Sequence, residues 1–130
     1  MSDTNSTNPG GLDAALLAKI PRHTFTIPES AKELATDPTV VTLRQLTLDE
    51  EIQATTAAGV SGKPIIYEST MRAVVAADNV EITWTGDGKV RFFAGVSSKV
   101  RDLIIQAFGH ISLPARKDSE AFLSSEVTTL

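Results

Sequence analysis

Apolar residues recur at spacings of three and four between residues 97 and 111, and this is the clearest hydrophobic pattern in the chain. The spacing places one set of side chains on a single face of a helix: Val100, Leu103, Ile104, Ala107, Phe108 and Ile111. Ser97 and Ser98 can cap the start of that helix, and Pro114 cannot continue it. We therefore expect a helix here whose apolar face is buried.

A second helix is predicted after Thr47, because Thr47 and Glu50 have the spacing of a capping box. Three consecutive acids, at positions 49–51, fall in its first turn, where the helix dipole favours negative charge. We expect this helix over residues 48–58, before Gly59.

A third helix is expected to begin near Pro64, which suits a first helical turn, and to extend to Asp78. Its apolar face is formed by Tyr67, Met71, Val74 and Val75. Two short helices are predicted near the chain ends, over residues 12–20 and 118–125.

Strands are predicted where β-branched residues or strict alternation dominate, over residues 23–27, 39–46 and 80–84. A polar connection with one helical turn is expected between the first two strands, at residues 28–38. Gly86-Asp87-Gly88 is a turn signal, and residues 90–93 are expected to pair back as a hairpin.

The chain has 130 residues, of which 42% are hydrophobic, and this amounts to one domain with its own core. Residues 1–11 are almost entirely polar or small and are predicted to form a disordered, flexible tail. The expected fold is α+β. Residues 12–130 form a small, helix-dominated single domain with a short N-terminal β element.

Charge and composition restrict the partners. The net charge is −4, and the lysines and arginines are scattered, so no binding to nucleic acid or to anionic lipid is expected. No cysteine is present, which excludes disulfides and thiolate metal sites. The apolar runs are far shorter than the ~20 residues that cross a bilayer, and the N-terminus does not resemble a signal peptide. We expect a cytoplasmic protein.

No constellation of residues points to catalysis or to a cofactor. His23 and His110 lack the spacing of a helical zinc site, and the acids at 49–51 are better explained by a capped, solvated turn. Residues 59–63 lack the spacing of a phosphate-binding loop, and the 86–88 turn lacks the further oxygen ligands of a calcium loop. We expect no enzyme activity, no metal and no cofactor.

Trp84, Phe92 and Phe93 could form a platform on which nucleic-acid bases stack. The acidic balance of the chain favours the other interpretation, in which these aromatic residues belong to the core or contact a protein partner.

Three blocks of sequence, in a fixed order, carry a resemblance to a known family. They are a strand that runs into an acidic capped helix (residues 41–51), the block at residues 67–78, and residues 97–108 followed by residues 119–125. Together they resemble the tail assembly chaperones of tailed bacteriophages. In that family a block of the kind S-x-K-V-R-x-L, a helix with an aromatic residue, a loop and an acidic F-L-x-S end are common.

The resemblance implies a helix-rich, non-enzymatic protein of phage tail assembly. Such a chaperone binds the tape measure protein non-covalently, keeps it soluble and helps to recruit the tail tube protein. It acts in the host cytoplasm and is not expected in the mature virion. Many members are also made in a longer, frameshifted form.

Four apolar residues are the candidate protein-binding site: Met71, Phe108, Phe122 and Leu123. The alternative is that these residues are the core of the domain itself, which is the favoured interpretation for Met71 and Phe108, whereas both interpretations stay open for Phe122 and Leu123. Two other functions stay open, a structural tail or baseplate component that is retained in the virion, and a small regulatory or nucleic-acid-binding protein of a mobile element. Self-association is also left open.

Overall fold

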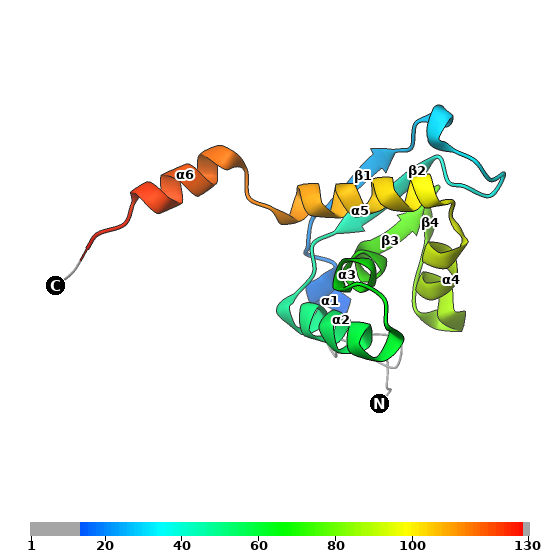
Figure 1. The fold of residues 1–130 in the computed structure, drawn as a ribbon, viewed down its shortest axis with the longest axis horizontal. Helices are drawn as coiled ribbons and strands as arrows, with labels where there is room; N and C mark the ends of the chain where they lie inside the picture. Colours follow the sequence, from blue (N-terminus) through cyan, green and yellow to red (C-terminus); the bar gives the residue numbers. More distant parts are fainter. Residues whose placement is uncertain (1–13, 129–130) are drawn as a thin grey trace.

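The computed structural model describes residues 14–128, so the predicted tail at residues 1–11 lies outside the described part. A four-stranded antiparallel sheet is combined with helices, which confirms the α+β class (Figure 1). The elements are α1 (Ala14–Leu17), β1 (Arg22–Thr26), η2 (Glu29–Ala31), β2 (Val40–Arg44), α2 (Leu48–Ser61), α3 (Ile65–Ala73), β3 (Val74–Ala77), β4 (Val80–Glu81), η3 (Thr85–Asp87), α4 (Gly88–Gly95), α5 (Ser98–Ser112) and α6 (Arg116–Ser124).

The sheet has the strand order β1-β2-β3-β4, and every neighbouring pair is antiparallel. β1 and β2 pair without interruption, whereas the β2–β3 register shifts between Thr42 and Leu43. The strands predicted at 23–27 and 39–46 are thus confirmed. The two further strands come from the middle of the chain, so the sheet is larger than the short N-terminal element that we expected.

The core lies where α5 and α3 meet the sheet. The face of α5 that the hydrophobic pattern predicted is buried at Val100, Ile104, Phe108 and Ile111. It packs in one cluster with Val41 and Leu43 of β2, Val74 of β3 and Phe93 of α4. Burial of each large side chain of this kind contributes about 1.5–3 kcal/mol, so this cluster dominates the stability of the fold.

The capping box of α2 is confirmed. The Thr47 hydroxyl oxygen accepts a hydrogen bond from the backbone N–H of Glu50 at 3.3 Å, and the Glu50 carboxylate accepts one from the Thr47 N–H at 3.0 Å. The helix runs three residues past its expected end at 58. It stops at Gly62, whose φ of 77° lies in the left-handed region that favours glycine.

The helix predicted to extend to Asp78 ends at Ala73, and that prediction was wrong. Val74 begins strand β3 with no intervening loop. Two adjacent β-branched residues, Val74 and Val75, suit the extended chain, and β3 pairs on both sides, with β2 and with β4. The predicted apolar face still turns inward, because Met71, Val74 and Val75 are all buried.

The prediction of a hairpin between residues 80–84 and 90–93 was also wrong. β4 is only two residues long and pairs back to β3 across Asp78 and Asn79, both of which have positive φ. Residues 90–93 lie in helix α4 instead. Gly86 and Asp87 do form a sharp turn, with φ of 62° and 60°.

Gly88 shows why the chain must turn as it does before α4. A Cβ atom at this position would come within 2.5 Å of the Thr83 carbonyl oxygen, so the backbone passes too closely for any other residue. The helix that starts at Gly88 then points Lys89 and Phe93, one turn apart, into the body of the protein.

Beyond α5 the chain leaves the body of the protein. Residues 113–115 are extended, and α6 projects away with no buried residue, close to its predicted position (Figure 1). We call residues 113–128 the C-terminal arm. None of the helices in residues 14–128 has both the length and the apolar character that crossing a bilayer requires.

Candidate protein-binding site

The structure separates the four candidate contact residues into two pairs. Met71 of α3 and Phe108 of α5 belong to the core and are 4% and 8% exposed. Phe122 and Leu123 of α6 are 75% and 69% exposed on the arm. The first pair therefore stabilises the domain, and the second pair is available to another molecule.

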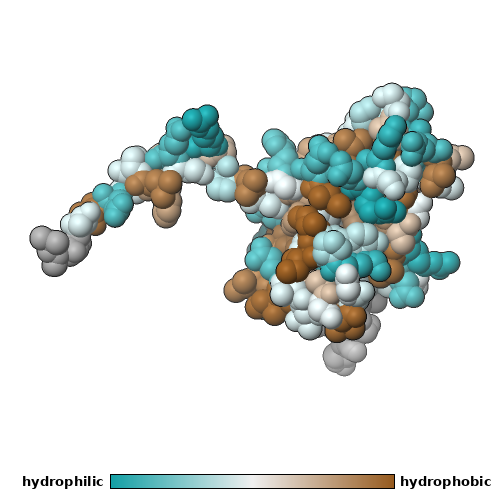
Figure 2. Space-filling model, viewed as in Figure 1, coloured by the Kyte–Doolittle hydropathy of each residue, from teal (hydrophilic) through white to brown (hydrophobic). Residues whose placement is uncertain are grey.

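The arm presents an apolar surface on one side of α6. Phe122 and Leu123 line a shallow hollow of about 410 Å³ together with Pro114, Asp118 and Ser119. Leu113 and Val127 extend the exposed apolar surface at either end of the arm, and Figure 2 shows this hydrophobic colour along it. Burial of one large apolar side chain stabilises a complex by about 1.5–3 kcal/mol before the costs of association, so two adjacent ones form a useful anchor.

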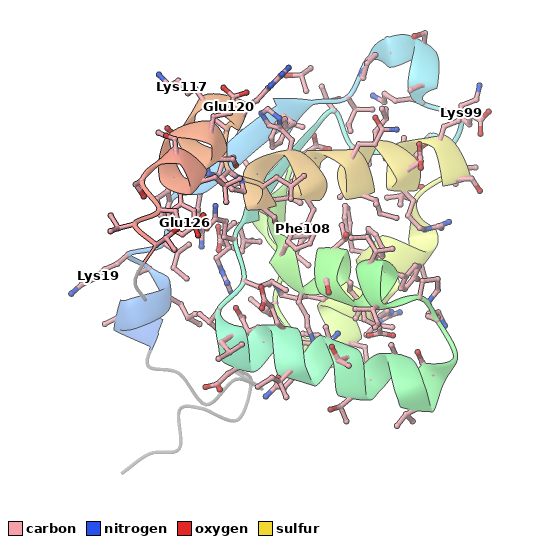
Figure 3. All side chains as sticks on the ribbon, turned by 60° about the vertical axis from the view of Figure 1, so that its left-hand side comes forward. Lys19, Lys99, Phe108, Lys117, Glu120 and Glu126 are labelled. Atoms are coloured by element: carbon pink, nitrogen blue, oxygen red, sulfur yellow. The ribbon has the colours of Figure 1, made fainter. Side chains whose placement is uncertain are left out.

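Phe108 also forms part of a second surface. A hollow of about 360 Å³ lies between α2, α3 and α5, and Leu46, Ile65 and Phe108 contribute its apolar lining. Figure 3 shows Phe108 on the side of α5 that faces α3. Leu48 and Ile52 of α2 are exposed apolar side chains as well, although neither lines this hollow. We call this the α2–α5 hollow, and in Figure 2 hydrophobic surface gathers below α5.

Most charged side chains that the fold buries are paired. The Arg44 guanidinium donates two hydrogen bonds to the Glu50 carboxylate, at 2.8 Å and 2.7 Å, and both side chains are less than a tenth exposed. Burial by itself would raise the pKa of Glu50, but the hydrogen bond from Arg44 and the Thr47 backbone N–H outweigh it and lower the pKa. This pair joins β2 to the first turn of α2.

Lys89 is the one buried amine in the described residues. Its Nζ donates to the backbone carbonyls of Arg72 and Val74, at 2.7 Å and 2.6 Å, and lies 5.7 Å from the centre of the Trp84 ring. Burial lowers its pKa to about 7, and the nearby Arg44 acts in the same direction. Because its bonds satisfy carbonyls at the α3–β3 junction, Lys89 holds α4 against that junction.

Trp84 is half-buried against the core, and its ring is also approached by the Arg72 guanidinium at 5.2 Å. Phe93 is fully buried and contacts the Tyr67 ring edge-on, and Phe92 is half-buried beside the core. These three aromatic residues, expected to belong to the core or to contact a partner, thus lie in the core or against it.

Asp37 and Ser97 form a link that sequence reasoning missed. The Asp37 carboxylate accepts hydrogen bonds from the Ser97 backbone N–H and hydroxyl, at 2.9 Å and 2.7 Å, and from the N–H groups of Glu33 and Leu34. Burial alone would raise its pKa, but these four donors lower it well below the usual range. Ser97 stands at the cap position of α5, as expected, yet its hydroxyl bonds to Asp37 rather than to the helix. Sixty residues separate the partners, so no local pattern could reveal the link.

The remaining candidate chemistry does not assemble into a centre. His23 is exposed on β1, and His110 meets the Phe25 ring edge-on at 6.3 Å. Within residues 14–128 no group of three or more potential metal ligands comes together. Gly59 lies inside α2 rather than in a loop.

Comparisons of the chain with models of protein families, with curated proteins and with solved structures each found no match. Any function is thus inferred from the surfaces of the chain itself and from the order of its sequence blocks.

Proposed function

We propose that this chain is a tail assembly chaperone of a tailed bacteriophage, which binds the tape measure protein without covalent chemistry and keeps it soluble. The observation that carries the proposal is the exposed pair Phe122 and Leu123 on an arm that projects from the body. The order of the sequence blocks at residues 41–51, 67–78 and 97–125 supports it. The proposal requires no catalytic group, metal or cofactor.

The arm suits a long helical client. A client of this kind presents apolar stripes along its length, and a short helix with two adjacent large apolar residues can pack against such a stripe in many registers. Phe122 is an aromatic anchor of the sort that dominates binding energy in protein interfaces. Because α6 stands clear of the body, it can approach a client that is itself extended.

The α2–α5 hollow is the second surface that we assign to the client. Ile65, Leu46 and the edge of Phe108 offer apolar contact, and Glu51 lies at the lining. A client segment with an apolar stripe and a flanking basic residue fits this combination. The tail tube protein is a further partner that the proposal includes, with no surface assigned to it.

The proposal is tested by co-expression with the tape measure protein of the same phage. That protein should precipitate when it is expressed alone and remain in the soluble fraction with this chain. The double variant Phe122→Asp/Leu123→Asp should abolish the rescue, because it removes the apolar anchor without touching a buried residue. Val60→Asp is the control, since Val60 is an even more exposed apolar residue on α2 that lines neither hollow, and it should leave the rescue intact. An unaffected rescue in the double variant would count against the arm, and no rescue by the wild type would count against the function.

Mass spectrometry of purified particles separates the proposal from the alternative function. A chaperone is absent from the finished particle or present in traces. Stoichiometric amounts would instead identify a structural tail or baseplate component.

A further inference from the structure

A third hollow lies between the β1 region and α5, the helix that leads into the C-terminal arm. It has a volume of about 370 Å³, and it is bordered by Phe25 and Ile27 of the β1 region and by Leu103, Gln106, Ala107 and His110 of α5. The four α5 residues recur at spacings of three and four, so they form one stripe along the helix, beside the stripe that is buried in the core. We call this the β1–α5 hollow.

We propose that α6 folds back along α5 and closes over the β1–α5 hollow, so that the chain alternates between the open arm seen in Figure 1 and a closed helical hairpin. The closed form buries Phe122 and Leu123 against Leu103 and Ala107. This inference does not depend on the identity of the client.

The length of the connection permits the closure. Residues 113–115 are the only residues between α5 and α6, and helical hairpins commonly use connections of two to five residues. Leu113 and Ala115 are extended. Leu113 precedes a proline and is confined to extended ψ, so the reversal comes from changes of ψ at Pro114 and Ala115, while Pro114 keeps its fixed φ.

In the closed hairpin, the axial distances from residues 113–115 determine which residues of α6 lie opposite which residues of α5. In an antiparallel hairpin, positions at equal distances from the connection face each other, and each residue advances about 1.5 Å along its helix. Ser119 then lies about 6 Å from the connection, level with the gap between Gln106 and His110. Phe122 lies about 10 Å from it, level with Gln106 and near Leu103.

The faces and charges of the helices also match. Asp118, Ser119, Phe122 and Leu123 line one side of α6. In the closed hairpin the Asp118 carboxylate comes level with His110, whose imidazole N–H can donate to it. Asp118 and His110 therefore lie nearest to the connection at residues 113–115. Phe122 and Leu123 lie over the apolar part of the β1–α5 hollow.

Engineered disulfides test the closure, and they are clean probes because the chain contains no cysteine. The pair Gln106→Cys/Ser119→Cys keeps Phe122 and Leu123 and should oxidise within one molecule. The matched control, Gln106→Cys/Lys117→Cys, places the second thiol on the opposite side of α6. Closure predicts oxidation about tenfold faster for the first pair, whereas a freely moving arm would oxidise both at the same rate.

A third variant identifies the cause of any difference. Adding Phe122→Asp to the Gln106→Cys/Ser119→Cys chain should reduce its rate to that of the control, because the apolar anchor of the closed form is lost. Equal rates in the first two variants would overturn the proposal. Cross-links that join two molecules and increase with protein concentration would also overturn it, since a second copy would then supply the arm. The measurement uses no client, so its failure would leave the co-expression test unaffected.

Discussion

At the scale of single residues, the buried Arg44–Glu50 pair joins strand β2 to helix α2 outside the apolar core. Both charges are removed from water, and the two hydrogen bonds between them compensate for that loss only while both partners are present. Glu50 also closes the capping box of α2, so one carboxylate serves the strand, the helix and the cap.

Arg44→Ala should lower the free energy of unfolding by about 3–5 kcal/mol, because it leaves the Glu50 charge buried without its partner. Urea denaturation measures the change. Arg22→Ala is the control, since Arg22 pairs with Glu81 on the surface, where side chains are 46% and 60% exposed. That pair is worth less than about 1 kcal/mol. Equal losses in the two variants would contradict the assignment.

Asp37 should make the protein sensitive to acid. Since its pKa is lowered on folding, the stability that it contributes is fully present above the usual pKa of an aspartate and is lost as the pH falls through the lowered value. Asp37→Asn should reduce stability at neutral pH and flatten the decline between about pH 5 and pH 2. Thermal unfolding across that range measures it. Asp102→Asn, exposed on α5, should preserve the steep decline, and an unchanged slope in Asp37→Asn would contradict the prediction.

At the scale of elements, local signals could be predicted and long-range pairing could not. The cap at Thr47 and the stripe from Val100 to Ile111 depend on residues within one helix, so the sequence is sufficient for them. The pattern of Met71, Val74 and Val75 fits a helix and a buried strand alike, and pairing with β2, some thirty residues earlier, selects the strand from Val74 onward. The strand predicted at residues 90–93 was wrong for a related reason. Its β-branched and aromatic residues suit a strand locally, but the turn at residues 86–88 leads into helix α4 instead.

The prediction of the candidate binding residues from the sequence was limited in a similar way. Met71 and Phe122 are both apolar residues on predicted helices, and the candidate set placed the buried one and the exposed one side by side. In the structure, Met71 shares α3 with Ala73 of the core cluster and with Tyr67 packed against it, whereas α6 has only Phe122 and Leu123 as large apolar residues. An apolar pair with no wider stripe is therefore the signal that could have distinguished surface from core.

Thr47→Ala should destabilise the protein by about 1 kcal/mol, because the first turn of α2 loses its cap. Thr55→Ala is the matched control within the same helix. The Thr55 hydroxyl donates only to the Glu51 carbonyl, and alanine is the better helix former, so this change should be neutral or slightly stabilising. Chemical denaturation of both variants measures the difference. A Thr47→Ala variant as stable as Thr55→Ala would show that the cap is dispensable.

At the scale of the whole molecule, a tightly packed body is joined to an arm that contributes little to it. α5 has four buried side chains in the main cluster, and α6 has none. Local stability follows the number of buried contacts, so the two helices should open independently. An arm held this weakly is consistent with both proposals, the binding of a client and the closure over the β1–α5 hollow.

Hydrogen exchange should reveal this difference directly. Backbone amides in the middle of α5, such as those of Ile104 and Phe108, should exchange only when the whole domain unfolds. Amides of α6 should exchange at least about a hundredfold faster, because fraying of the arm breaks no core contact. Exchange followed by mass spectrometry resolves the two helices. Equal protection would mean that the arm is part of the cooperative unit.

The junction of α3 and β3 does not tolerate the insertion or deletion of a residue. Ala73 ends the helix and Val74 begins the strand, so no spare residue separates them. Since side chains alternate across a strand, deleting or inserting one residue here would exchange the two faces of β3 and expel Val74 from beside Leu43. The turn at Gly62, before α3, can accommodate an added or deleted residue, whereas the α3–β3 junction cannot. Natural length variation in relatives of this chain should therefore avoid it.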